Sequence, residues 1–117
     1  MDKYKFEYDV EDDVLYIWNA LEEVEESVES SEDIILDLNR EGKVIGIEIF
    51  YASEFLNIFN KEIDKEFLKN LKDAYIEYKE FRNALFIVLV VESKNKKISQ
   101  PLPPLRKSEY ISPLLAN

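Results

Sequence analysis

One apolar stretch, Ala84 to Val91, constrains the fold of this 117-residue chain more than any other segment. As a strand it sends one apolar set to one face and a second apolar set to the other, the first set being Leu85, Ile87, Leu89 and Val91. Both faces must be covered, which favours a central strand or an interface. Eight apolar residues fall short of the about 20 that a membrane helix needs. The N-terminus also lacks the long apolar stretch of a signal peptide, so the sequence predicts a cytoplasmic protein that does not enter membranes.

Two β-hairpins are predicted ahead of this strand. Residues 4–10 alternate between apolar and charged side chains, and a polar turn leads into the β-branched and aromatic residues 14–18. The apolar segments 34–38 and 44–50 flank a short polar loop with a glycine near its end, which is typical of a hairpin. Between the hairpins, residues 22–33 hold seven acidic side chains. Val24 and Val28 are spaced by four, as in a helical turn, but a short edge strand is the favoured interpretation, because charge along an edge prevents aggregation.

Helical spacing follows the hairpins. Ser53 is a candidate cap for a short helix, and Asp64 is a candidate cap for a longer helix over residues 65–81, whose apolar residues recur at steps of three and four. All four prolines lie in residues 93–117, which predicts an extended tail.

The expected fold class is therefore α+β. It comprises an antiparallel β-meander of about four strands, one short and one long helix, a further apolar strand and an extended proline-rich tail. The length predicts one domain, 1–117, with the meander in 4–56, helix plus strand in 57–92 and the tail in 93–117.

Three segments of the first half form a recognisable pattern: FEYDVEDDVLYIW at 6–18, DIILDLNREGKVIGIEI at 33–49 and YAS at 51–53. The pattern resembles the small prokaryotic family catalogued as domain of unknown function 2283, over about residues 4–56. The resemblance implies a small antiparallel meander followed by a helix, with no established activity or cofactor. Some members are thought to sit beside toxin genes, so the resemblance also implies a partner-neutralising, antitoxin-like role.

The chain contains no cysteine and no histidine. Thiol nucleophiles, Ser-His-Asp triads and the usual zinc sites are therefore excluded within one chain. What remains is chemistry by carboxylate, lysine, tyrosine or serine, with oxygen ligands for magnesium or calcium. No cofactor is expected. The enrichment in glutamate and lysine, with few thermolabile side chains, indicates a thermophile.

The formal net charge is −10, and the charged residues are distributed unevenly along the chain. Residues 1–60 hold 17 acidic against 4 basic side chains, whereas residues 61–117 hold 8 acidic against 11 basic ones. The acidic half repels phosphate, so nucleic acid is not an expected partner. A basic protein, or the second half of another copy, suits the acidic surface better.

Two carboxylate groups are candidate sites. The acidic turn at Asp9, Glu11, Asp12 and Asp13 is a weak candidate for magnesium or calcium, against the alternative of a solvated hairpin turn. Asp37 and Glu48, on neighbouring strands, are the best pair for general acid–base work, but the favoured interpretation is two outward, solvated residues and no catalytic residue is expected. The tyrosines and Trp18 of the first hairpin are interpreted as core and cross-strand packing.

Interaction residues are predicted on the apolar strand and in the tail. They are Leu85, Ile87, Leu89 and Val91, with Pro101, Pro103 and Pro104. The prolines fit a polyproline-helix ligand, but an extended tail laid across its own or a neighbour's sheet is the favoured interpretation. Covering both faces of the apolar strand predicts a homodimer or larger assembly. The preferred function is a non-enzymatic, self-associating interaction module with an acidic face, and the alternative is a carboxylate-dependent, magnesium-type hydrolase.

Overall fold

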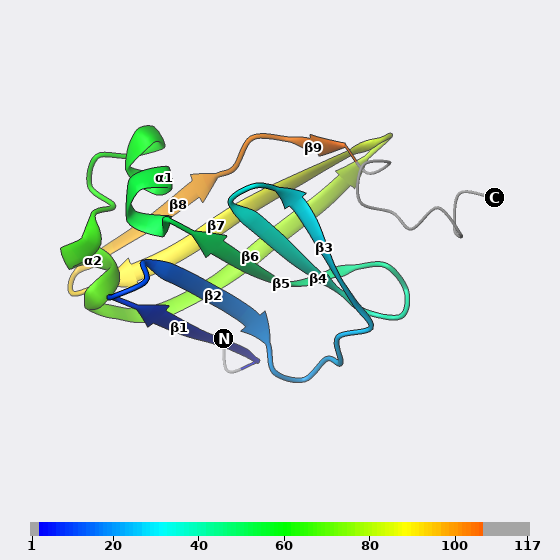
Figure 1. Ribbon diagram of the computed structural model, residues 1–117, viewed down its shortest axis with the longest axis horizontal. Helices are drawn as coiled ribbons and strands as arrows, with labels where there is room; N and C mark the ends of the chain where they lie inside the picture. The colour runs from blue at the N-terminus through cyan, green and yellow to red at the C-terminus, as the bar shows by residue number, and fades with distance from the viewer. Residues whose placement is uncertain (1–2, 107–117) are drawn as a thin grey trace.

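A computed structural model describes residues 3–106, and the first half of that range forms a five-stranded antiparallel sheet, sheet A (Figure 1). Its strands are β1 (Tyr4–Asp9), β2 (Val14–Asn19), β3 (Glu26–Ser31), β4 (Ile34–Leu38) and β5 (Val44–Phe50), in the order β1-β2-β5-β4-β3. Both predicted hairpins are confirmed, and β5 returns to the centre beside β2. Gly42 has φ 79° in the second turn, the left-handed region that favours glycine. The acidic block supplies β3, which is the edge strand that the sequence predicts.

Sheet B is built from the second half of the chain. Its strands are β6 (Leu71–Phe81), β7 (Ala84–Ser93), β8 (Lys96–Pro101) and β9 (Leu105–Arg106). β7 is central, as its two apolar faces predict, because β6 pairs with it throughout and β8 and β9 pair with it in turn. Between the last two strands, the Leu102 amide donates to the Ile87 carbonyl at 2.9 Å. The described part of the tail is therefore extended and lies on its own sheet.

The predicted long helix over 65–81 is wrong beyond its first five residues. α2 (Lys65–Lys69) is capped by Asp64, whose side chain accepts the Phe67 amide at 2.8 Å, but the helix ends at Asn70. From there β6 alternates, with Ala74 and Ile76 buried and their neighbours more exposed. Aromatic and β-branched residues favour a strand, and pairing with β7 along the whole hairpin outweighs the helical spacing.

The predicted cap of the short helix is also wrong. α1 (Ala52–Phe59) has Tyr51 at its N-cap position, with φ 53° and no side-chain cap hydrogen bond. Ser53 lies inside the first turn, where its amide and hydroxyl both bind Asp13. A carboxylate from a distant turn thus takes the place of a local cap.

One hydrophobic core joins the two sheets and the helices. From sheet A it takes alternate residues such as Leu15, Ile17 and Ile47, all fully buried. From sheet B it takes one face of β7, and α1 and α2 add Leu56 and Leu68. Both helices lie at one end of the molecule, and the turn between β6 and β7 lies at the other (Figure 1). Within residues 3–106, neither helix is long and apolar enough to cross a membrane.

Candidate interaction surface

The acidic turn does not bring its carboxylates together. Asp9 accepts the Asp12 amide at 3.0 Å at the exposed rim, whereas Asp13 points inward and is only 7% exposed. Glu11 and Asp12 lie on the exposed side of the turn. Among the residues that the structure describes, no three acidic side chains are grouped so that they could hold a metal ion.

Asp13 instead links the first hairpin to α1. Its carboxylate accepts the Tyr8 hydroxyl at 2.5 Å, the Ser53 amide at 3.0 Å and the Ser53 hydroxyl at 2.8 Å, and its carbonyl accepts the Ala52 amide at 2.8 Å. Burial alone would raise the pKa of Asp13, but these hydrogen bonds outweigh it and hold the pKa below its usual range. Burial, and then the bond to Asp13, raise the pKa of Tyr8. The cluster is a structural clamp whose donors are all matched by acceptors.

A second buried carboxylate lies on the side of sheet A that faces away from the core. Asp37 is 7% exposed and accepts the Tyr16 hydroxyl at 2.6 Å and the Ser27 hydroxyl at 2.7 Å. Burial, followed by the bond to Asp37, raises the pKa of Tyr16. Gly46 is directly opposite Asp37, and a Cβ there would lie 3.0 Å from the carboxylate. Glycine at this position lets the carboxylate lie close against the sheet.

Asp37 and Glu48 do not form the candidate acid–base pair, and the favoured interpretation of two solvated residues is wrong for Asp37, which is buried. Glu48 is opposite Ile35 rather than Asp37, and both oxygens of Asp37 are already engaged by hydroxyl donors. Tyr16, opposite Glu48 on β2, is the residue adjacent to both. The arrangement positions an aromatic side chain on the sheet and engages the Asp37 carboxylate, so the two carboxylates do not act as a pair.

The rest of this side of sheet A combines aromatic, aliphatic and acidic side chains, and we call it the acidic face. The Tyr16 and Trp18 rings stack, with centroids 4.7 Å apart and planes at 18°. They lie on an outer surface rather than in the core, because they alternate along β2 with the buried Leu15 and Ile17. The register places the following on the same side: Val14, Ile35, Glu29, Glu48 and Phe50, with Lys5, Glu7 and Asp9 on β1. The large apolar members are half-buried, so the surface is partly apolar, and four of the five charged residues in this list are acidic.

One end of the acidic face is hollowed into a pocket of about 530 Å³. It is lined by Asp12, Val14, Glu29, Ser31, Glu32, Ile35, Phe50 and Tyr51. Three of these residues are acidic, none is basic, and Tyr51 is 60% exposed. We call it the acidic pocket. An apolar floor with a rim of one charge is suited to a side chain or segment that is both apolar and cationic.

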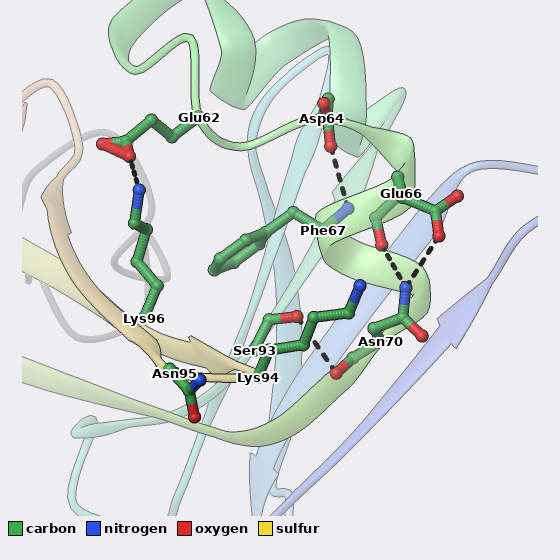
Figure 2. A pocket seen from close by; sticks show the side chains of 9 residues that line it. All are labelled: Glu62, Asp64, Glu66, Phe67, Asn70, Ser93, Lys94, Asn95 and Lys96. Carbon is green, nitrogen blue, oxygen red and sulfur yellow. Dashed lines mark hydrogen bonds and ion pairs between the residues drawn. The ribbon is translucent and has the colours of Figure 1, made fainter.

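A different pocket, of about 490 Å³, lies between α2 and the turn joining β7 to β8 (Figure 2). Several of its polar groups bind one another: Lys96 pairs with Glu62, and the Asn70 amide group donates to Glu66 at 3.0 Å. The Ser93 hydroxyl also donates to the Asn70 carbonyl at 3.1 Å. The Ser93 bond and the Lys96 pair thus join the segment around α2 to sheet B, and the Asn70–Glu66 bond lies within that segment.

The predicted interaction residues fall into two environments. Leu85, Ile87, Leu89 and Val91 are buried between the sheets of this one chain, each at most 2% exposed. Pro101 lies on the exposed side of β8, and Pro103 and Pro104 are exposed between β8 and β9. The opposite side of β7 carries Phe86, which is 41% exposed. On this side of β7 Phe86 is therefore exposed near the turn, whereas Val90 farther along the strand is buried.

Sequence reasoning missed both carboxylate clusters. Asp13 and Ser53 are 40 positions apart, and no local pattern links them. The signal for the other cluster was present, because an aspartate in an apolar strand and a glycine inside the next strand both depart from their patterns.

Comparison with known proteins places these features in a family. The pattern of the family described as "Protein of unknown function (DUF2283)" matches residues 5–53, which include both carboxylate clusters. A Methanosarcina mazei protein named "Putative hypoxanthine phosphoribosyltransferase" is 32% identical over 103 residues, 86% of this chain and 79% of that protein. An uncharacterized protein of Methanocaldococcus jannaschii is 31% identical over 67 residues, 57% of each chain. No solved structure matches the chain. The protein belongs to the DUF2283 family, whose function is unknown.

Proposed function

We propose that the protein is a non-enzymatic interaction module that binds a basic partner on its acidic face. The observation that carries the proposal is the acidic pocket, in which Glu29, Glu32 and Asp12 surround an apolar floor. The excess of acidic residues in the first half supplies the long-range attraction for such a partner. Half-buried rings such as Trp18 supply apolar contact area, and aromatic residues are enriched where proteins bind one another. An antitoxin-like role would be one form of this activity.

The geometry favours the module over a magnesium-type hydrolase. Asp13 is occupied by Tyr8 and Ser53, and Asp9 by a backbone amide, so the turn offers divergent carboxylates. Both oxygens of Asp37 are likewise engaged.

Phosphoribosyl transfer, which the name of the Methanosarcina mazei relative suggests, has no supporting observation in residues 3–106. Such a reaction handles phosphate groups, which proteins commonly bind at helix N-termini. The N-terminus of α1 already holds an internal anion, because Asp13 accepts the Ser53 amide. The acidic surroundings oppose phosphate as well.

Trp18 gives a direct test, since it is the single tryptophan of the chain and lies on the acidic face. Titration with a synthetic peptide that alternates arginine and leucine is expected to change the Trp18 fluorescence with saturation, and an aspartate–leucine peptide is expected to have no effect. Substituting Glu29→Gln and Glu32→Gln is expected to weaken binding about tenfold. Glu23→Gln with Glu41→Gln makes the same change in net charge at exposed positions away from the pocket. Equal weakening by both pairs would show nonspecific charge attraction and contradict the proposal.

A further inference from the structure

The turn joining β6 to β7 carries the exposed aromatic side chains of sheet B. Phe81 is 60% exposed and Phe86 is 41% exposed. The register places them on one side, because Phe86 is opposite Lys79 and Phe81 is opposite Ala84. Contiguous exposed apolar groups on one side of a hairpin are candidates for contact with a partner. We call residues 79–86, on this side, the hairpin tip.

The hairpin tip is basic on the side that bears the phenylalanines. The Arg82 guanidinium lies 5.3 Å from the centre of the Phe81 ring, and Lys79 is exposed next to Phe86. Glu80, the acidic residue of this segment, is opposite Leu85 and therefore on the other side of the hairpin. Glu77 is on the same side as the phenylalanines but lies outside the tip, opposite Val88. The tip thus presents two aromatic rings with two cations.

The hairpin tip and the acidic pocket are chemically complementary. The pocket has an apolar floor that includes Ile35 and Phe50, and a rim of three acidic residues without a basic one. Its volume of about 530 Å³ is ample for a phenylalanine ring with a neighbouring guanidinium. The tip has the opposite charge and the exposed apolar groups that such a pocket would bury.

Within one chain these two surfaces do not face each other. The pocket includes Tyr51, which directly precedes α1, at the end of the molecule where both helices lie. The hairpin tip is at the opposite end (Figure 1). A tip can therefore fill a pocket only on another molecule.

We infer that the partner of the acidic pocket is a second copy of this chain, whose hairpin tip inserts its aromatic and cationic side chains into the pocket. The inference rests on the proposed function and names its partner. Such a contact joins two different surfaces, so each molecule retains one free tip and one free pocket. The assembly grows head to tail, either closing into a ring or extending as a chain. The contact is small, so association is weak and depends on concentration and on salt.

Two variants test this arrangement by mixing. The tip variant carries Phe81→Ser and Arg82→Asn, and asparagine accepts the φ of 57° at that position. The pocket variant carries Glu29→Lys and Glu32→Lys. Each is expected to remain monomeric in sedimentation velocity at concentrations at which the unmodified protein associates. Glu23→Lys with Glu41→Lys is the matched charge control and is expected to associate normally. Far-ultraviolet circular dichroism and a thermal melt establish that each variant is folded.

Mixing the two variants is expected to give a complex of two chains and nothing larger. The tip variant offers an intact pocket and the pocket variant an intact tip, so one contact forms and growth stops. Absence of this complex, or a tip variant that associates like the unmodified protein, overturns the inference. Association that survives in the pocket variant indicates tip-to-tip contact and overturns it equally. If the unmodified protein stays monomeric but still binds the arginine–leucine peptide at the acidic pocket, the inference fails and the proposed function stands.

Discussion

Replacing Asp13 with asparagine should destabilise the protein far more than the same change at its neighbour Asp12. The Asp13 carboxylate accepts three donors, the Tyr8 hydroxyl and the Ser53 amide and hydroxyl, at 2.5 to 3.0 Å. An asparagine keeps one acceptor oxygen but turns an amide group toward groups that are themselves donors. Hydrogen bonds to a charged group contribute about 1.5–3 kcal/mol each, and a buried donor left unpaired costs about 1–3 kcal/mol. Since part of the cluster survives, we expect a loss of about 2–4 kcal/mol.

The assay is urea unfolding followed by the fluorescence of Trp18, at pH 7. In a thermal melt, the same loss of unfolding free energy lowers the melting temperature by on the order of 10 °C for a chain of this length. Asp12→Asn is the matched control, because Asp12 lies in the same turn, is exposed and undergoes the same change in charge. Asparagine also tolerates the φ of 56° at position 13, so backbone strain does not confound the comparison.

The pH dependence gives an independent check of sign. The pKa of Asp13 is lowered from its ordinary value of 3.8, so the carboxylate stabilises the folded state above about pH 4, and this contribution is lost as the pH falls through the lowered pKa. The difference between the unmodified protein and Asp13→Asn should therefore be constant near neutrality and shrink in acid. Equal stability of the two variants at pH 7, or a difference that grows in acid, would refute the role assigned to Asp13.

Three further predictions concern Gly46 on the acidic face, the buried tyrosines, and metal binding at the acidic turn. Gly46→Ala should destabilise the fold by about 1–3 kcal/mol in urea unfolding, because its Cβ would lie 3.0 Å from the Asp37 carboxylate and 3.3 Å from the Ile17 carbonyl; no loss would mean that Asp37 moves freely. Raised pKa values keep Tyr8 and Tyr16 protonated above pH 10 and should make stability fall as the pH rises beyond that value. In a spectrophotometric titration, Tyr8 and Tyr16 should ionise only on alkaline unfolding. Magnesium or calcium should leave the melting temperature unchanged, since a cation bound only by the native state would raise it, and a rise that Asp12→Asn removes would restore the metal site at the acidic turn.

Sheet A could be predicted from the sequence because each of its strands is short and keeps one periodicity. Residues 4–10 alternate without exception, and the polar loops beside β4 and β5 leave no other interpretation. The charge of β3 marked it as an edge strand before its pairing was known.

The segment after Asp64 misled because two periodicities coexist in it. Leu68, Leu71, Tyr75 and Tyr78 are spaced as on a helix, whereas Ala74, Ile76 and Tyr78 are spaced as on a strand. Local propensity is nearly balanced there, and the long pairing of β6 with β7 decides the outcome. That pairing is a property of two segments together, so it is not visible in one of them.

The sequence predicts the negative charge of the acidic face but not the arrangement of its side chains. Its excess of acidic residues was read directly from the first 60 residues. Asp37 lies opposite Gly46 instead of Glu48 because the register of β4 on β5 fixes those partners. Sequence analysis also assigned the Tyr16 and Trp18 rings to core and cross-strand packing, since periodicity alone does not tell which side of a sheet faces the core.

The prolines on the border of sheet B bear on amyloid formation. An edge strand with free amide groups is a template for cross-β stacking, and proline lacks the amide hydrogen that such stacking needs. Pro101 lies in β8, and Pro103 and Pro104 interrupt the border before β9. On β3, the edge strand of sheet A, Glu26 and Glu29 oppose pairing with another copy of the strand, because like charges repel each other. We therefore expect the two borders to oppose fibril growth by different means, and replacing the three exposed prolines with valine should shorten the lag time of thioflavin-detected fibrils.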